Sequence, residues 1–346
     1  MDPISAQSVL AAAGAGGGGA ATEIAVASAS LPCIFVWEWN SGFGTRYANP
    51  STLPAGSGAG VTFHPDGNAI ALAHASSPNI TAYPWSSESG FGSKFANPST
   101  LPTGQGLDVK FSPDGNDIVV AHASSPYVTA YPWSSASGFG SKYSNPSTLP
   151  PDTGHGCDFT PDGNNIVVSH NQSPYVTAYS WSSGFGSKYS DPSTLPTGRA
   201  RGVAFSSDGN HVAVAVNSSP YVTAYPWSSG FGSKYANPST LPVTRGRRVT
   251  FNPDSDVLAV VHDGSPYITA YAWSSGFGSK YANPSTLPSG LGLGVAFTSD
   301  GADIAVAHQG SPYISVYPWS SGFGTKYADP SSLPNDGRDV AFKPFD

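Results

Sequence analysis

The sequence predicts an all-β fold, a seven-bladed β-propeller with four antiparallel strands per blade. A phrase close to S-P-Y-V-T-A-Y-P-W-S-S-G-F-G-S-K-Y-A-N-P-S-T-L-P recurs along the chain, and its tryptophans are 46 or 48 residues apart. They are Trp39, Trp85, Trp133, Trp181, Trp227, Trp273 and Trp319. A period in this range, built from strand-like runs, is typical of propellers. The 40 glycines, 32 prolines and only 11% charged residues fit short strands joined by tight turns.

The first segment, residues 1–22, is predicted to be a flexible tail. Residues 11–21 are only alanine and glycine, which is the composition of a linker. The amino terminus also lacks the positively charged start of a secretory signal. The repeats then occupy 23–346 without interruption, so we expect one propeller domain after this tail.

Each repeat contains four strand-like runs. In the second full copy they are Leu107–Ser112, Asp117–Ala123, Tyr127–Trp133 and Phe139–Ser144. The first two are joined by the residues Pro-Asp-Gly-Asn at 113–116, a tight turn in which proline sets φ and glycine accepts a positive φ. The same turn recurs at 66–67, 162–163, 208–209 and 300–301, and as the degraded pair Asp254-Ser255. Four antiparallel strands of this kind make one propeller blade.

The two ends of the repeat region predict how the ring closes. The first repeat begins at Ile24–Ala27 with the second strand of the pattern, and the chain ends at Val340–Pro344 with the first strand. We therefore expect residues 338–344 to complete the blade that residues 24–50 begin. Such a closure leaves no open sheet edge.

The repeat resembles those of the WD40 and YVTN-type propellers. The residues Phe-Ser-Pro-Asp-Gly at 111–115, followed by a strand and then by a strand ending in tryptophan, carry this resemblance, which covers 23–346. Trp-Ser replaces the Trp-Asp dipeptide, and the Gly-His before the first strand is missing, so the family's Asp–His–Ser/Thr–Trp network is not carried over. The nearly identical repeats also resemble propellers encoded in marine viral and bacterial genomes, which implies a viral structural protein.

Composition argues against several classes of function. The net charge of −7 disfavours general nucleic-acid binding. No apolar run approaches the roughly 18 residues that membrane insertion needs. Cys33 and Cys157 are the only cysteines, so there is no disulfide framework. Because phosphate loops, nucleophile elbows and metal-spaced clusters are missing, we expect neither a cofactor nor a metal.

Five arginines form the candidate binding site. In the geometry that the resemblance implies, the loops after the second and fourth strands share one face of the disc, the top, and the Asp-Gly hairpins lie on the bottom. Arg199, Arg201, Arg245, Arg247 and Arg248 fall in two successive top loops that vary between repeats. Arginine suits bidentate contacts with carboxylate or phosphate. We expect a basic patch for an anionic ligand or a protein partner, with ordinary solubilising charge as the alternative.

Thiol, imidazole and carboxylate groups come together only at 155–158. His155 and Cys157 are conceivable as a catalytic pair, but Cys157 stands at a core position and is better explained as a small buried residue. Asp158 is expected to form a structural ion pair with Lys110 of the preceding repeat. Histidines that close the second strand in five repeats are expected to hydrogen-bond into the following loop; they are His74, His122, His170, His262 and His308.

These features predict a chain that is not an enzyme but a non-catalytic scaffold for protein or ligand binding or display. A virion-associated attachment or decoration protein is the expected context, with a cytoplasmic location as the alternative, and tail 1–22 is expected to join a larger assembly. One alternative is a multivalent glycan-binding propeller that uses positions such as Phe231, Tyr235 and Asn237. A propeller enzyme, with His155 and Cys157 as its candidate site, is the second.

Overall fold

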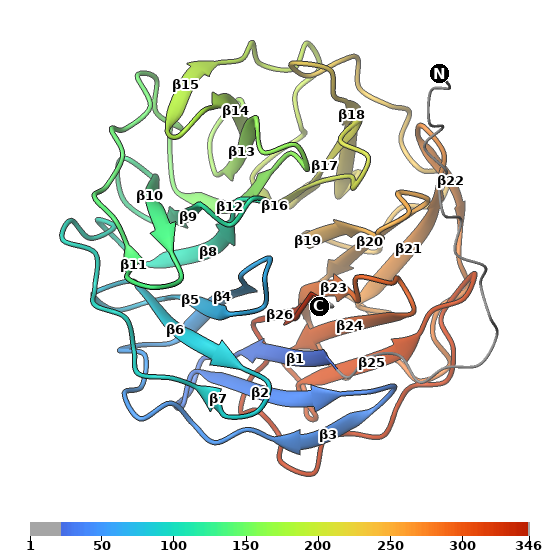
Figure 1. Cartoon of the computed structure of the whole chain (residues 1–346). Coiled ribbons are helices and arrows are strands. Elements are labelled where there is room, and N and C mark those ends of the chain that lie inside the picture. The colour runs from blue at the N-terminus through green and yellow to red at the C-terminus, as the bar shows by residue number, and fades with distance from the viewer. Residues whose placement is uncertain (1–21, 345–346) are drawn as a thin grey trace, which may run out of the picture.

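Seven small antiparallel sheets are arranged around a central axis in the computed structural model (Figure 1), which describes residues 22–344. The predicted all-β, seven-bladed propeller is confirmed. The strands are β1 (Thr22–Ala27), β2 (Ile34–Trp39), β3 (Phe43–Arg46), β4 (Gly58–Phe63), β5 (Ala69–His74), β6 (Ile80–Ser86), β7 (Gly90–Phe91), β8 (Gly106–Phe111), β9 (Asp117–His122), β10 (Val128–Ser134), β11 (Gly138–Phe139), β12 (Gly154–Phe159), β13 (Asn165–His170), β14 (Val176–Trp181), β15 (Phe185–Lys188), β16 (Ala200–Phe205), β17 (His211–Val216), β18 (Val222–Pro226), β19 (Gly246–Phe251), β20 (Val257–His262), β21 (Ile268–Trp273), β22 (Phe277–Lys280), β23 (Gly292–Phe297), β24 (Asp303–His308), β25 (Ile314–Pro318) and β26 (Asp339–Phe342).

Each blade is a meander whose first strand faces the axis. The innermost strands β4, β8, β12, β16, β19, β23 and β26 each contact the next around the ring. Five blades have the predicted four strands. In the other two, β16–β18 and β23–β25, the outermost strand is reduced to the single bridges Trp227↔Phe231 and Trp319↔Phe323.

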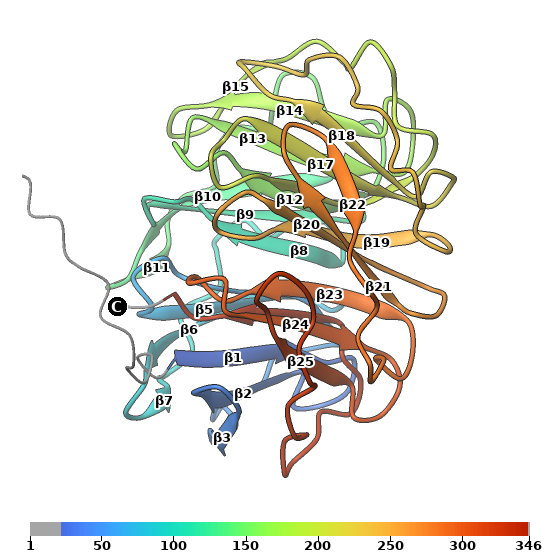
Figure 2. The ribbon, with the colours of Figure 1, turned by 90° about the vertical axis from the view of Figure 1, so that its right-hand side faces the viewer.

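The ring closes as predicted. β26 pairs antiparallel with β1, in a register that runs from Ile24↔Phe342 to Ala27↔Asp339. Thr22 Oγ1 donates a hydrogen bond of 2.6 Å to the carbonyl of Lys343. β1 begins at Thr22, one residue before the predicted start of the domain, and the rest of the predicted tail, 1–21, lies outside the described residues. The side view (Figure 2) shows β1 alongside β2 and β3, the strands of the same blade that follow it.

The hairpins between first and second strands have the predicted turn chemistry. Gly115 has φ 71°, and in the degraded copy Ser255 takes the same left-handed region at φ 58°. The Asp114 carboxylate accepts hydrogen bonds from Ser112 Oγ at 2.6 Å and from the backbone N–H of Asn116 at 3.1 Å. These bonds close the turn on its own side chains, and Asp162 and Asp208 make the equivalent bonds in the next two repeats.

The core consists of apolar clusters between adjacent blades, each centred on a repeat tryptophan. Trp133 meets Phe95, Phe111 and Phe139 edge to face, with ring centroids 5.0–5.1 Å apart. Ala69 and Ala71 of the neighbouring blade belong to the same cluster. Because every blade buries its face against the next one, the blades are held as one body.

The five strand-closing histidines are structural. Each is fully buried, and its Nε2 lies 2.9–3.0 Å from a hydroxyl on the next strand, such as Thr129 for His122. This bond crosses to the third strand. Each ring also has a hydrogen bond with the backbone of the following loop, as expected; for His122 the partner is Ser124. Residues 22–344 contain no cluster of histidine, cysteine and acidic residues that could hold a metal, and no helix long and apolar enough to cross a membrane.

Candidate active site in the central channel

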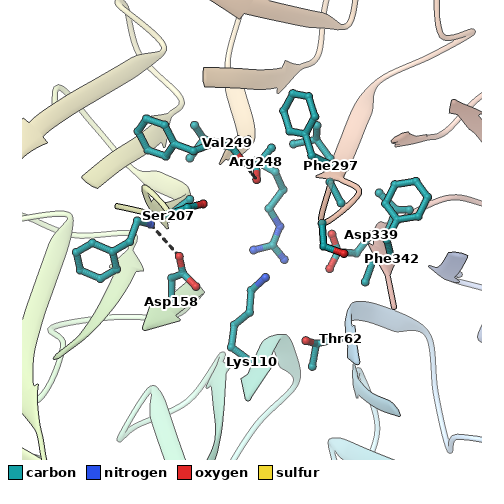
Figure 3. Close-up of a pocket in the computed structure, with 18 of the residues that line it drawn as sticks. Thr62, Lys110, Asp158, Ser207, Arg248, Val249, Phe297, Asp339 and Phe342 are labelled. Atoms are coloured by element: carbon teal, nitrogen blue, oxygen red, sulfur yellow. Dashed lines mark hydrogen bonds between the residues drawn. The ribbon is translucent and has the colours of Figure 1, made fainter. Parts of the chain in front are cut away.

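Five charged residues line a cavity of about 500 Å³ at the axis. We call them the channel cluster; they are Asp108, Lys110, Asp158, Arg248 and Asp339, and Figure 3 labels all of them except Asp108. The cavity wall also includes Ser207, Pro253 and Ser299. These three belong to the hairpins after the innermost strands, so the cavity lies on the bottom side of the channel.

Glycines make room for the channel cluster. At the level of the channel where Asp108, Arg248 and Asp339 stand, the other four innermost strands carry Gly60, Gly156, Gly202 and Gly294. A Cβ on Gly60 would lie 2.8 Å from Cα of Asp108, and one on Gly294 would lie 2.5 Å from Cα of Asp339. Glycine therefore lets neighbouring strands approach closely. At this level of the channel, three charged side chains occupy the space around the axis.

Arg248 crosses the channel. Its Nη1 lies 2.8 Å from Asp108 Oδ2, a pair 140 residues apart in sequence, and Nη2 donates to the carbonyl of Leu107 at 3.1 Å. Asp108 also accepts the backbone N–H of Cys157 at 3.1 Å. The pair is largely buried, and it forms part of the cavity wall.

Asp158 is placed by the neighbouring blade. Its Oδ2 accepts the backbone N–H of Phe205 at 2.8 Å. Burial raises the pKa of Asp158 to about 6, although Lys110 opposes that rise. The ion pair that we expected with Lys110 is not formed at contact distance within residues 22–344; the two charges interact across the cavity instead.

Lys110 points toward the guanidinium of Arg248 from the opposite wall, with Asp158 and Asp339 on either side (Figure 3). Burial opposes its charge, but Asp158, Asp108 and Asp339 outweigh burial and raise the pKa of Lys110. Asp339 accepts the backbone N–H of Val61 at 3.1 Å, and burial raises its pKa to about 6. The cavity thus holds carboxylates that ionise near neutral pH beside two fixed cations. This combination supports proton transfer and stabilisation of an oxyanion.

The predicted basic patch is brought together in part. Arg199, Arg245 and Arg247 are close enough to Arg201 to repel its charge. Arg248 is the exception. Arg201 and Arg247 occupy the equivalent bulged positions of β16 and β19, whereas Arg248 occupies the next position, which is Gly202 in β16 and faces the axis. It belongs to the channel cluster, not to the patch.

The residues of the two alternative functions are used in packing. Cys157 is fully buried, and burial raises the pKa of its thiol well above the usual value, so it is an inert core residue as expected. Of the positions considered for glycan binding, Phe231 packs edge to face on Trp227 and Tyr235 on Trp273, with centroids 5.2 and 5.4 Å apart.

Sequence reasoning missed Asp108, Arg248 and Asp339 as members of one site. It assigned Arg248 to a variable top loop and gave Asp108 and Asp339 no role, although both fall in predicted strands; the three residues lie within β8, β19 and β26. The available signal was their alignment with glycine in the other four repeats. A charged residue that replaces a repeated glycine in an innermost strand points to the axis.

No family model matches the chain, and no curated protein matches it either. Solved structures do match. The periplasmic gluconolactonase PpgL of Pseudomonas aeruginosa has 16% identity and a TM-score of 0.70, over 94% of this chain and 99% of that one. Two proposed 6-phosphogluconolactonases are also similar. The protein from Bacteroides fragilis has 14% identity and a TM-score of 0.73, over 93% and 98% of the two chains. The protein from Bacteroides uniformis has 16% identity and a TM-score of 0.68, over 93% and 99%.

At this identity the likeness shows the fold, and it corrects what we expected of the function. We expected a non-catalytic scaffold that is not an enzyme. The similar propellers are named as lactonases, and this finding contradicts that expectation. The resemblance to WD40 repeats and to viral propellers is not confirmed. The similar structures favour the enzymatic alternative over the scaffold.

Proposed function

We propose that this chain is a hydrolase that opens a small polar lactone in the central cavity. The observation that carries the proposal is the placement of Asp158, with a pKa raised to about 6, in one cavity with the ammonium group of Lys110. A base poised near the working pH and a preorganised cation beside it are the two elements that acyl transfer to water needs. The similar lactonases support the choice of substrate class.

In the proposed reaction, the Asp158 carboxylate takes a proton from a water molecule as the water oxygen bonds to the lactone carbonyl carbon. The carbonyl oxygen becomes an oxyanion, which Lys110 and Arg248 stabilise from opposite walls. The ring C–O bond then breaks, and the leaving alkoxide receives the proton from Asp158. One water is added, and the product is the open hydroxy acid.

The test is the rate of lactone opening by the purified chain. We expect D-glucono-δ-lactone to open faster than its uncatalysed rate at pH 6.5. Asp158→Asn should lower kcat by about 10²–10⁴-fold because it removes the base, and Lys110→Met by about 10²–10³-fold because it removes an oxyanion partner. Asp254→Asn, which changes an exposed carboxylate in a bottom hairpin outside the cavity lining, is the matched control and should be fully active.

Two results would reject the proposal. One is a wild-type protein that does not exceed the uncatalysed rate with gluconolactone or its 6-phosphate. The other is an Asp158→Asn protein that unfolds at the wild-type temperature and keeps the wild-type kcat.

A further inference from the structure

We propose that four arginines on the top face bind a phosphate group carried by a small molecule. We call Arg199, Arg201, Arg245 and Arg247 the arginine cluster. It lies at the other end of the channel from the cavity, beyond the Arg248–Asp108 pair, and the inference does not depend on the hydrolase proposal.

The arginine cluster has an excess of positive charge. Asp263 is the one carboxylate of the described chain at ion-pair distance from it, and it serves two members. Its Oδ2 lies 2.7 Å from Arg245 Nε, and its Oδ1 lies 2.5 Å from Arg247 Nε. Arg199 and Arg201 form no ion pair within residues 22–344. Two of the four positive charges are therefore without a counter-ion.

Arg201 is the residue at which an anion is most needed. It is half-buried, and burial, followed by repulsion from Arg247, Arg199 and Arg245, lowers its pKa. Burial and like-charge repulsion both destabilise the positive charge of Arg201, so a bound anion would stabilise this side chain most.

The neighbour of Arg201 cannot take its hydrogen bond. Arg201 Nη1 lies 3.4 Å from His155 Nε2, which lies 2.8 Å from Asn171 Oδ1. Because Asn171 Oδ1 is an acceptor, His155 Nε2 carries its proton and cannot accept another from Arg201. Burial, with Arg201, lowers the pKa of His155 to about 4, so the ring is neutral at pH 7. The donors of Arg201 on this side remain available to a ligand.

The depth of the side chains favours a compact anion. Arg199 and Arg245 are exposed at the rim, whereas Arg201 and Arg247 are partly buried behind them. A phosphate group offers three acceptor oxygens, and guanidinium groups match them in bidentate fashion. Because Arg201 and Arg247 stand behind the exposed pair, a small phosphorylated ligand reaches all four guanidinium groups more readily than a long polyanion does.

The test uses inorganic phosphate and pyrophosphate as probes, titrated calorimetrically into the full chain in a low-salt, phosphate-free buffer. We expect saturable binding that Arg201→Gln weakens by at least tenfold. Arg338→Gln is the matched control. Arg338 precedes Asp339 just as Arg247 precedes Arg248, but its Nη2 is paired with Asp336 Oδ2 at 2.8 Å. Its loss should change the dissociation constant by less than twofold.

Three outcomes would overturn the inference. They are no saturable binding to the wild type, equal losses in Arg201→Gln and Arg338→Gln, and gluconate or an oligoglutamate peptide binding as tightly as phosphate. Asp158→Asn should bind phosphate like the wild type, which separates this result from the fate of the hydrolase proposal.

Discussion

The carboxyl group of Asp158 links the channel geometry to a measurable pH dependence. A general base must be deprotonated to act, and burial raises the pKa of Asp158 to about 6. We therefore expect kcat/KM for lactone opening to rise about tenfold per pH unit below pH 6, and to level off above it. Lys110, whose pKa is raised, stays charged over this range.

The measurement is a pH–rate profile between pH 4.5 and 8, corrected for uncatalysed opening. The residual activity of Asp158→Asn should lack the limb near pH 6. If that variant kept the same limb, another group would be the base, and Asp339, with its pKa also about 6, would be the first to examine.

Neighbouring residues on one strand can belong to different sites, and this limited what the sequence could predict. Arg247 pairs with Asp263 on the top face, whereas Arg248 reaches Asp108 across the channel. The local pattern places both arginines in one patch. The bulge beside Arg247 recurs in the innermost strands of six blades. The contact of Arg248 with Asp108 depends on the convergence of seven strands, which is not a local property of the sequence.

Among the elements, β26 is the strand that closes the ring. Val340 is 4% exposed and packs in a cluster with Ile24, Val26 and Trp39. Truncation after Gly337 removes this strand and exposes the backbone edge of β1. We expect the truncated chain to unfold at a lower urea concentration than the full chain, or to aggregate.

A synthetic peptide of residues 338–346 should restore the urea midpoint by adding the missing strand. The same peptide with Val340→Asp is the control and should not restore it. An unchanged midpoint after truncation would show that closure by β26 does not stabilise the propeller.

The blades were more predictable than the site because their signals are local. The Asp-Gly turns and the tryptophan period each lie within one repeat, and the phase of the two ends gives the closure. The weak outer strands beside Phe231 and Phe323 were not predictable, since the nearly identical sequence at Phe185 and Phe277 forms a longer strand. The channel cluster draws on four blades at once, and no single repeat contains it.

The whole molecule should lose stability in acid because it buries neutral histidines. Burial lowers the pKa of six of them to about 4; they are His74, His122, His155, His170, His262 and His308. In the unfolded chain these histidines bind protons near pH 6.5. Proton binding therefore favours the unfolded chain, and the free energy of unfolding decreases as the pH falls below that value. Asp158 and Asp339 act oppositely, since their raised pKa values mean that the folded state binds protons first.

Near pH 5 the unfolded chain binds about four more protons than the folded chain. This difference corresponds to a change in the free energy of unfolding of roughly 5 kcal/mol per pH unit. Urea unfolding at pH 7, 6 and 5 measures this slope. His122→Gln should reduce it by about one proton, and a free energy independent of pH would contradict the burial of neutral histidines.

The hydrogen bond between Thr22 and Lys343 joins residues 321 positions apart, and it has a consequence for biogenesis. During synthesis β1 emerges early, but its partner β26 is made only after all the intervening blades. Until then the nascent chain presents an unsatisfied strand to its surroundings, and loop closure over such a span is slow. Production of this protein should therefore depend on chaperone supply and on slower translation at low temperature, more than its stability once folded would suggest.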